Sequence, residues 1–185
     1  MRKDFYFKKA KSQGYLARSI YKLFEVNKKY KLISPNSKVL DLGCSPGSWV
    51  QACLELNVKE IVGVDINEVK IEDKRFKFIK KDINKLDTKK LGKFDVVLSD
   101  LAPSTSGNKD LDVDRSINLS YTALKIAKKT LKPNGNFLVK VFQGSEFEEL
   151  LKEIKKYFQF TKSYKPKSTR KSSKEIYIIA IKYIK

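Results

Sequence analysis

Several carboxylates in the sequence follow apolar runs, at the points where buried strands would end. Asp41 lies in "KVLDLG", Asp65 ends "IVGVD" and Asp100 ends "FDVVLSD", while Asp82 occupies the same place in "FIKKD". In an open parallel sheet the carboxyl ends of the strands form the edge where ligands bind. A carboxylate can accept hydrogen bonds from two hydroxyls, so these positions suit a ligand with a ribose, an exocyclic amine and a cationic centre.

Lys140 is the second position that points to chemistry. It interrupts "NFLVKVF", a run with the composition of a strand buried on both faces. A buried lysine needs a partner or a function, because an unpaired ammonium is costly to remove from water. The chain has no histidine, which excludes a Ser–His–Asp or Cys–His centre and a histidine-ligated metal. Proton transfer must therefore depend on carboxylate, lysine, tyrosine or water.

The stretch "KVLDLGCSPGSWVQ", residues 38–51, places two glycines and a proline between a strand-like run and a helix-like run. A glycine turn from strand into helix lets the backbone approach a ligand closely. A dinucleotide loop would read G-x-G-x-x-G, but here Ser45 stands in the middle position between Gly43 and Gly47. The missing glycine disfavours NAD. S-Adenosylmethionine, which has the ribose, the amine and the cationic centre, is the ligand that these positions favour.

The elements that must position these residues alternate along the chain. Strands are expected at 38–42, 60–65, 75–79, 94–99 and 136–142, followed by a closing pair at 159–164 and 175–183. Helices are expected at 15–32, 47–56, 84–91, 116–131 and 145–157, and the irregular stretch 102–115 reads as a mobile lid. The alternation predicts an α/β, Rossmann-like fold with a mostly parallel sheet, helices on both faces and an antiparallel pair at one edge. The length fits one domain over residues 1–185.

The net charge of +19 is concentrated at the two ends of the chain. Residues 1–31 hold ten lysines and arginines against two acidic residues, and residues 160–185 hold eight against Glu175 alone. If the fold brings these segments together, they form a surface for a polyanion, and nucleic acid is the expected partner. The two cysteines, Cys44 and Cys53, are interpreted as small buried side chains rather than as a disulfide or a metal site.

Five stretches also carry a family resemblance: "ARSIYKLFE", "DLGCSPGSWVQ", "LSDLAPSTSG", "FLVKVFQG" and "KPKSTRKSSKEIYIIA". With them the chain resembles the FtsJ/RrmJ-type RNA 2′-O-ribose methyltransferases from about residue 11 to the C-terminus. The resemblance implies a seven-stranded methyltransferase sheet with an antiparallel last strand and no metal. It implies the catalytic residues Lys22, Asp100, Lys140 and Glu175. It also implies contacts to S-adenosylmethionine from Gly47, Trp49, Asp65, Asp82 and Asp100, and Gly43 in the same loop is a further candidate.

The chain departs from the family pattern in the glycine turn. Many bacterial members have Pro-Gly-Gly-Trp where this chain has Ser48 before Trp49, and Cys44 stands where alanine is common. Structural roles also remain open for three of the candidates. Lys22 could be a solvent-facing lysine of an amphipathic helix, Trp49 could be a core residue, and Glu175 could be a strand-end charge.

The resulting hypothesis is 2′-O-methylation of RNA, with a uridine of large-subunit ribosomal RNA as the favoured target and tRNA as the alternative. Lys140 could act as a general base or as a cation that stabilises the alkoxide. Base N-methylation is disfavoured, because the sequence Asp100-Leu101-Ala102-Pro103 lacks the [ND]-P-P-[YF] pattern and its aromatic residue. A non-catalytic RNA-binding protein of ribosome assembly is the alternative of another class. The N-terminus lacks the apolar centre of a signal peptide and no run is long enough to span a membrane, so a cytoplasmic protein is expected.

Overall fold

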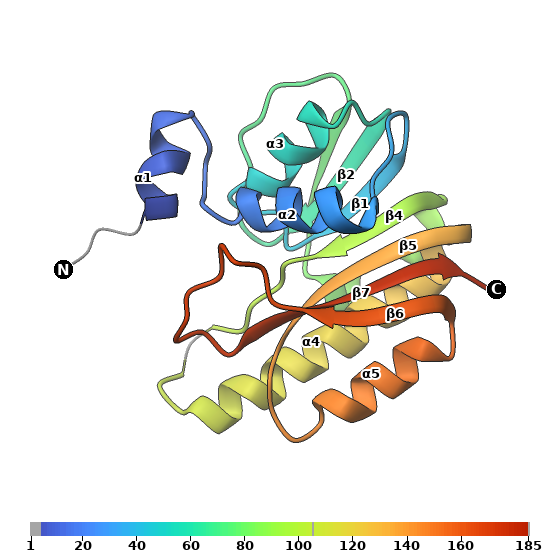
Figure 1. The fold of residues 1–185 in the computed structure, drawn as a ribbon. Helices are drawn as coiled ribbons and strands as arrows, with labels where there is room; N and C mark the ends of the chain where they lie inside the picture. Colours follow the sequence, from blue (N-terminus) through green and yellow to red (C-terminus); the bar gives the residue numbers. More distant parts are fainter. Residues whose placement is uncertain (1–4, 105, 185) are drawn as a thin grey trace.

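The architecture is seen in a computed structural model that describes residues 5–104 and 106–184. Its centre is a seven-stranded sheet in the order β3-β2-β1-β4-β5-β7-β6 (Figure 1). The strands are β1 (Lys38–Leu42), β2 (Glu60–Asp65), β3 (Phe76–Lys80), β4 (Phe94–Ser99), β5 (Leu131–Phe142), β6 (Phe158–Tyr164) and β7 (Glu175–Tyr183). All seven lie close to the predicted positions. The largest difference is at β5, which begins five residues before the predicted start at residue 136.

Strands β3, β2, β1, β4 and β5 pair in parallel, whereas β7 pairs antiparallel with both β5 and β6. The predicted mostly parallel sheet with an antiparallel last strand is therefore confirmed. The parallel strands read as near-continuous apolar runs because both faces of the sheet are covered. Their carboxyl ends, at Leu42, Asp65, Lys80, Ser99 and Phe142, lie along one edge.

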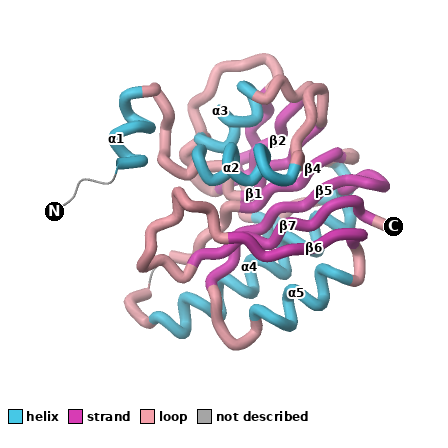
Figure 2. Tube along the Cα trace, viewed as in Figure 1, coloured by secondary structure: helices cyan, strands magenta, loops and turns pink. Residues whose placement is uncertain are grey.

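Within the described part of the chain, five α-helices surround the sheet: α1 (Phe5–Ser12), α2 (Ile20–Tyr30), α3 (Ser48–Glu55), α4 (Lys109–Thr130) and α5 (Phe147–Lys155). Figure 2 shows α2 and α3 on one side of the strands and α4 and α5 on the other, which confirms the predicted helices on both faces. Each side has its own hydrophobic cluster. Side chains of α2 and α3 pack around Trp49 and Tyr177, and side chains of α4 and α5 pack around Phe137.

The helix predicted at 84–91 is wrong. Two short 3-10 turns, Ile83–Lys85 and Thr88–Lys90, stand there instead. The side chains of Asp82 and Asp87 accept hydrogen bonds from the backbone N–H groups of Asn84 and Lys89. Aspartates that bond the backbone two residues ahead stabilise local turns and compete with a continuous helix.

The irregular stretch predicted at 102–115 is also shorter than expected. Helix α4 begins at Lys109, because the Asn108 side chain caps it by accepting from the N–H groups of Asp110 and Leu111. The carboxylate of Asp112 accepts from both the N–H and the hydroxyl of Ser106, which ties the loop to the first helical turn. The capping residue and the acidic first turn were the sequence signals that place this start.

At the N-terminus the predicted helix 15–32 is replaced by two separate helices. Helix α1 was not predicted, and α2 begins only at Ile20 because Gly14, with a φ of 75°, starts an irregular turn between them. The face of α2 with Leu23 and Val26 is buried in one hydrophobic cluster with side chains of β1 and α3.

Candidate active site

The four expected catalytic residues meet on the sheet face that carries α2 and α3. Lys140 on β5 lies directly opposite Tyr177 on β7 in the antiparallel register. Glu175 lies two residues before Tyr177 on the same strand, so its side chain projects from the same face. Asp100 follows the end of β4, and Lys22 reaches the group from the first turn of α2.

Two ion pairs organise these side chains. The Lys140 Nζ lies 3.1 Å from Asp100 Oδ1 and donates to the Asp100 backbone oxygen at 2.7 Å. The Lys22 Nζ donates to Glu175 Oε1 at 2.6 Å. Lys140 is only 7% exposed, so its charge is held in a mostly desolvated place with a carboxylate partner. The solvent-facing alternative for Lys22 is disfavoured, since its side chain is 12% exposed and paired.

Tyr177 connects the two pairs, and the sequence analysis missed it. Its hydroxyl donates to Asp100 Oδ1 at 2.8 Å, and the Lys22 Nζ lies 5.9 Å from the centre of its ring. Burial, followed by the nearby charges of Asp100 and Glu175, raises the pKa of Tyr177 well above its usual value. The phenol is therefore a neutral donor between two carboxylates. Its period-two spacing from Glu175 on a buried strand was the signal that could have identified it.

The candidate cofactor residues lie along the carboxyl edge of the sheet. The Asp65 carboxylate accepts from the N–H groups of Ser45 and Asn67 at 3.0 and 2.8 Å, so the glycine turn is tied to the end of β2. Asp82 is held by the N–H and side-chain amide of Asn84. Ile66, directly after Asp65, is 64% exposed and offers an apolar face beside these carboxylates.

Glycine is required at two positions of the turn for different structural reasons. Gly43 has a φ of 79°, and a Cβ added there would lie 2.7 Å from Leu101 Cδ2, in the segment after β4. Gly47 caps α3 with a φ of 112°, and an added Cβ would lie 2.7 Å from Ile71 Cδ1. Glycine at these positions lets the turn after β1 approach the neighbouring segments of the carboxyl edge.

Trp49 lies in the core rather than at the surface of this edge. It is buried, its indole N–H donates to the Ser19 backbone oxygen at 3.0 Å, and its ring lies 5.9 Å from that of Tyr177. It therefore links α3 to the start of α2 and to β7. These contacts are those of a core residue, which was the alternative considered for Trp49. A direct contact of Trp49 with a cofactor stays a prediction.

Asp41 is the most unusual carboxylate of the chain. It is fully buried on β1, and neither carboxylate oxygen has a hydrogen-bond partner among the described residues. Burial, with the charges of Asp100 and Asp65, raises its pKa well above the usual range. Burial likewise raises the thiol pKa of Cys44 and Cys53, which are free and buried as expected.

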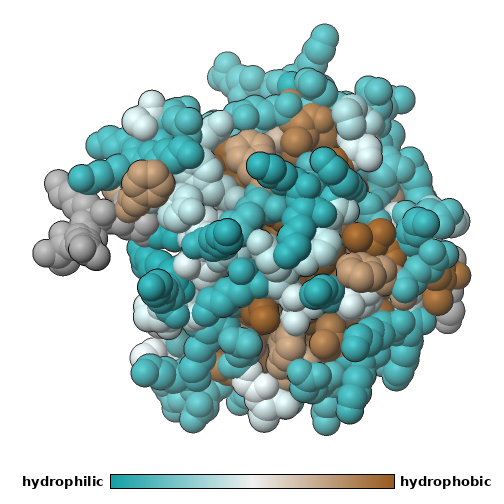
Figure 3. All heavy atoms as spheres, in the orientation of Figure 1, coloured by the Kyte–Doolittle hydropathy of each residue, from teal (hydrophilic) through white to brown (hydrophobic). Residues whose placement is uncertain are grey.

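The fold brings parts of the two basic segments, residues 18–29 and 164–174, together through Glu25 on α2. Its carboxylate accepts from the Tyr164 hydroxyl at 2.7 Å and from the Lys167 N–H at 2.8 Å, and a guanidinium nitrogen of Arg18 donates to the Ser168 oxygen. The loop after β6 is thus fixed against α2, beside the Lys22–Glu175 pair. Hydrophilic side chains dominate this view of the molecule, as Figure 3 shows.

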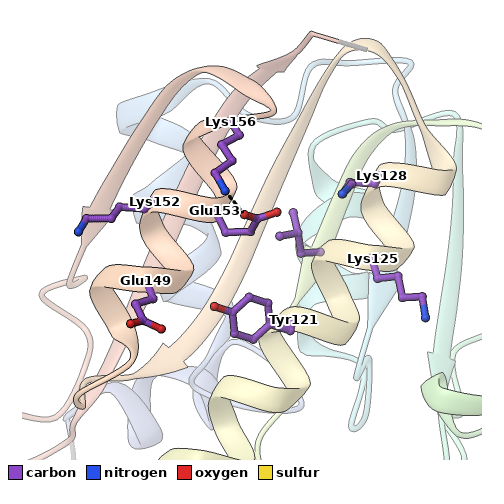
Figure 4. Close-up of a pocket in the computed structure, with 8 residues that line it drawn as sticks. Tyr121, Lys125, Lys128, Glu149, Lys152, Glu153 and Lys156 are labelled. Carbon is purple, nitrogen blue, oxygen red and sulfur yellow. Dashed lines mark hydrogen bonds and ion pairs between the residues drawn. The ribbon is translucent and has the colours of Figure 1, made fainter.

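A separate hollow of about 710 Å³ lies between α4 and α5, on the opposite side of the sheet (Figure 4). Its rim carries both lysines and glutamates, and Lys156 pairs with Glu153 at 2.7 Å. Its lining residues belong to α4, to α5 and to Lys156 directly after α5, so it is separate from the carboxyl edge of the sheet. Within residues 5–104 and 106–184 no cluster of three His, Cys, Asp or Glu side chains could hold a metal ion. In the same described part of the chain, no helix is long and apolar enough to cross a membrane.

The strand order, the antiparallel β7 and the carboxylates at the ends of the parallel strands define a Rossmann-like methyltransferase. Comparison with known proteins gives the family. Residues 15–183 match the family model described as FtsJ-like methyltransferase. The chain belongs to the FtsJ-like methyltransferase family, and the resemblance inferred from its sequence is confirmed.

Relatives and a solved structure agree with this assignment. "Ribosomal RNA large subunit methyltransferase E" of Methanothrix thermoacetophila is 45% identical, with 98% of this chain and 73% of that protein aligned. The protein of the same name from Archaeoglobus fulgidus is 42% identical over 100% of this chain and 98% of its own length. A crystal structure of a Plasmodium falciparum protein named as a ribosomal RNA methyltransferase is 30% identical, with a TM-score of 0.81 and coverage of 92% of this chain and 99% of that one.

Proposed function

We propose that this enzyme transfers a methyl group from S-adenosylmethionine to the ribose 2′-oxygen of an RNA nucleotide. The observation that carries this proposal is the buried group of two ion pairs, Lys22–Glu175 and Asp100–Lys140, next to the carboxyl edge of the sheet. The group contains two lysine ammonium groups, each paired with a carboxylate, and the neutral Tyr177 hydroxyl, which donates to Asp100. It suits stabilisation of negative charge on a hydroxyl oxygen.

The carboxyl edge supports S-adenosylmethionine as the cofactor. Asp65 is fixed by two backbone N–H groups and retains lone pairs for the two ribose hydroxyls. The exposed Ile66 would cover one face of the adenine, and Asp82 would accept from its exocyclic amine. When bound, the cofactor supplies an activated methyl group on a sulfonium sulfur.

Lys140 is assigned to the acceptor hydroxyl. An ammonium has three N–H donors, and two of them point to the backbone and carboxylate oxygens of Asp100. The third is available for the ribose 2′-oxygen, whose negative charge grows as its proton passes to a water molecule. Held at 7% exposure, this donor acts where water screens it little, and it needs no reorganisation during the reaction. These contacts favour the role of a cation that stabilises the alkoxide.

Asp100 keeps Lys140 in place, and Lys22 and Glu175 complete the pocket for the acceptor. Asp100 holds Lys140 from one side and is itself held by the Tyr177 hydroxyl. Glu175 holds Lys22 through one N–H donor, and an ammonium has two more to offer the acceptor ribose. Accurate positioning of the hydroxyl supplies much of the rate, since the methyl group is already activated.

Large-subunit ribosomal RNA is the proposed substrate. The support is the name of the relatives, which match this chain over 95% or more of its length, and the basic surface that residues 18–29 form with residues 164–174. A uridine target and a cytoplasmic location stay predictions. A structured RNA loop, offered with an unpaired nucleotide, suits an enzyme that acts on a ribose.

The proposal is tested by offering the enzyme purified large ribosomal subunits, naked ribosomal RNA and tRNA, all lacking the modification. Methylated riboses are then mapped to the nucleotide. We expect methylation of the large-subunit RNA, free or in the particle. Methylation of tRNA alone would contradict the proposed substrate, and a methyl group found on a base would contradict the proposed chemistry.

A further inference from the structure

Helix α1 is an exposed aromatic and basic element next to the candidate active site. It reads "FYFKKAKS", with no acidic residue. Phe5 and Phe7 are 68% and 59% exposed, the largest exposed fractions among the phenylalanines of the described residues. Hydrophobic-coloured atoms stand among hydrophilic ones on α1, at the left of Figure 3. Two exposed rings within three residues are costly to leave in water unless something covers them.

The inner face of α1 is anchored to the catalytic side of the molecule. Ala10 is buried, the Tyr6 ring lies 5.5 Å from that of Tyr21, and the Arg18 guanidinium lies 5.6 Å from the centre of the Tyr6 ring. Arg18 lies in the turn two residues before α2, and its guanidinium feels the charge of Glu175, the partner of Lys22. The anchoring leaves Phe5 and Phe7 on the flanks of α1, facing outward.

A pocket of about 450 Å³ lies between α1 and the loop after β6. We call it the arginine pocket, and it is lined by Tyr6, Arg18, Ser168, Thr169, Arg170, Lys171 and Ser172. Burial and the positive charge of Arg170 lower the pKa of Arg18, and the negative charge of Glu175 acts in the opposite direction. The pocket thus places two guanidinium groups near each other, and the planar fork of a guanidinium matches the geometry of a phosphate.

Thr169 gives an independent indication of a ligand in the arginine pocket. It is 8% exposed, and its hydroxyl has no hydrogen-bond partner within the described part of the chain. A buried hydroxyl without a partner costs free energy. A bound phosphate oxygen would offset this cost by accepting a hydrogen bond from the hydroxyl. Cationic and hydroxyl groups together are the chemistry that binds a phosphodiester.

We propose that α1 and the arginine pocket form a binding site for unpaired RNA nucleotides that flank the methylated one. The phosphodiester lies in the arginine pocket, and neighbouring bases stack on Phe5 and Phe7. Lys8 and Lys11 on α1 are exposed. In this arrangement they lie near the phosphates of the bound RNA strand. This inference rests on the proposed function, because it takes RNA as the substrate.

Unpaired RNA is favoured over a duplex for a physical reason. Base faces are accessible for stacking only where nucleotides are splayed out, as in loops and bulges. A duplex would meet α1 with phosphates alone and would leave Phe5 and Phe7 uncovered. The charge of Glu175, the partner of Lys22, acts on Arg18, so the arginine pocket adjoins this pair and the flanking nucleotides lie beside the ribose that is methylated.

The test compares Phe5→Ala/Phe7→Ala with the matched control Phe160→Ala, which removes a 44% exposed ring on β6. The probes are an RNA hairpin with 2-aminopurine in its unpaired loop and the fully paired duplex of the same stem. For the hairpin we expect affinity to fall about five- to a hundredfold for each ring that stacks. The 2-aminopurine quenching seen with the wild type should disappear, and duplex affinity should not change.

A second variant addresses the arginine pocket. Arg170→Gln should lower the log–log salt slope of hairpin binding by about 0.7, because one phosphate is no longer neutralised. Cofactor affinity should stay at the wild-type level in all three variants, and the single-turnover rate should stay at that level in the control Phe160→Ala. Circular dichroism checks that the variants are folded.

Two results with RNA would overturn the inference: unchanged hairpin affinity in Phe5→Ala/Phe7→Ala, or an equal loss of affinity for hairpin and duplex. Phosphatidylserine vesicles are a third probe, and a loss of binding confined to these vesicles would also overturn it. The last outcome would assign α1 to a membrane surface. Binding and quenching need no turnover, so they test the inference separately from the proposed function. A wild-type enzyme that methylates no RNA would contradict the proposed function while leaving these measurements interpretable.

Discussion

At the scale of single residues, the site depends on groups that would be costly to bury alone. Lys140, Asp100 and Tyr177 satisfy one another through bonds of 2.7 to 3.1 Å. Removing one partner leaves another charged or polar group buried without compensation. This mutual dependence explains why the lysine can persist inside a strand that is otherwise apolar, and it ties catalytic geometry to local stability.

Asp65 gives a prediction for the cofactor. Asp65→Ala should weaken S-adenosylmethionine binding by about 1.5–3 kcal/mol for each charged hydrogen bond to the ribose that the substitution removes. Isothermal calorimetry measures the affinity. Asp87→Ala is the matched control, because Asp87 caps a 3-10 turn through the Lys89 N–H and does not lie at a strand end. Unchanged affinity in a folded Asp65→Ala protein would remove this residue from the cofactor site.

Tyr164 gives a prediction for pH dependence. Burial, with the hydrogen bond to Glu25, raises its pKa to about 12, from 10.0. A raised folded-state pKa means that the native state holds the proton more tightly, so this contribution is fully present below pH 10.0 and is lost between pH 10.0 and about 12. Urea unfolding of the wild type and Tyr164→Phe should show a stability difference that shrinks across this range. A difference that grows with pH would contradict the assignment.

At the scale of elements, the sequence predicted the strands and the helices α3 and α5 well, but it misplaced the starts of α2 and α4 and predicted a helix at 84–91 that is absent from the described structure. The apolar runs that form β1, β2 and β4 end at the predicted residues, because burial on both faces leaves an unmistakable pattern. The errors at 84–91 and 102–115 come from Asp82, Asp87 and Asn108, whose side chains bond nearby backbone N–H groups. Short polar residues can start or stop a helix, and hydrophobic periodicity does not reveal which they do.

Whether a residue of the site could be predicted also depended on how clearly it departs from the surrounding apolar pattern. The strand-end carboxylates and Lys140 could be found because polar groups interrupt apolar runs. Tyr177 could not, because a tyrosine in "EIYIIAI" fits an ordinary buried strand, and only the register between β5 and β7 places it opposite Lys140. Helix α1 was missed because its contacts to Tyr21 and Arg18 are tertiary.

Asn108 provides a prediction at this scale. Asn108→Ala should lower the free energy of unfolding by about 0.5–2 kcal/mol, because the first N–H groups of α4 lose their cap. The control is Asn118→Ala, an exposed position within α4, where alanine should be neutral or slightly stabilising. Urea denaturation measures both. Equal stability of the two variants would mean that Asn108 does not set the start of α4.

At the scale of the whole molecule, one sheet joins two hydrophobic clusters, which supports our proposal of a single domain. The strand order carries β7 back beside β5, and the loop before β7 thereby meets α2. Residues 18–29 and 164–174 of the two basic segments thus lie beside the catalytic group. The charge distribution of the sequence indicated this surface, and the pairing of Glu25 with Lys167 and Ser168 supplies the contact.

The basic surface leads to a prediction about salt dependence. Replacing the exposed residues Lys167, Lys171 and Lys174 by glutamine should weaken RNA binding and reduce the log–log salt slope by about 0.7–0.9 for each phosphate that is no longer neutralised. The matched control replaces three exposed lysines that are not part of the basic surface, Lys74, Lys89 and Lys90. Binding is measured at several salt concentrations. Equal losses of affinity in the two triple variants would contradict a localised RNA surface.

The central claim is that Lys140 promotes methyl transfer to a ribose oxygen, and one measurement tests it directly. Wild type and Lys140→Ala are loaded with radiolabelled S-adenosylmethionine and given ribosomal RNA for a single turnover. The RNA is then digested to nucleosides. We predict a labelled 2′-O-methylnucleoside from the wild type, and almost none from a folded Lys140→Ala protein that binds the cofactor normally. A near wild-type rate in Lys140→Ala, or label recovered on a base, would contradict the account.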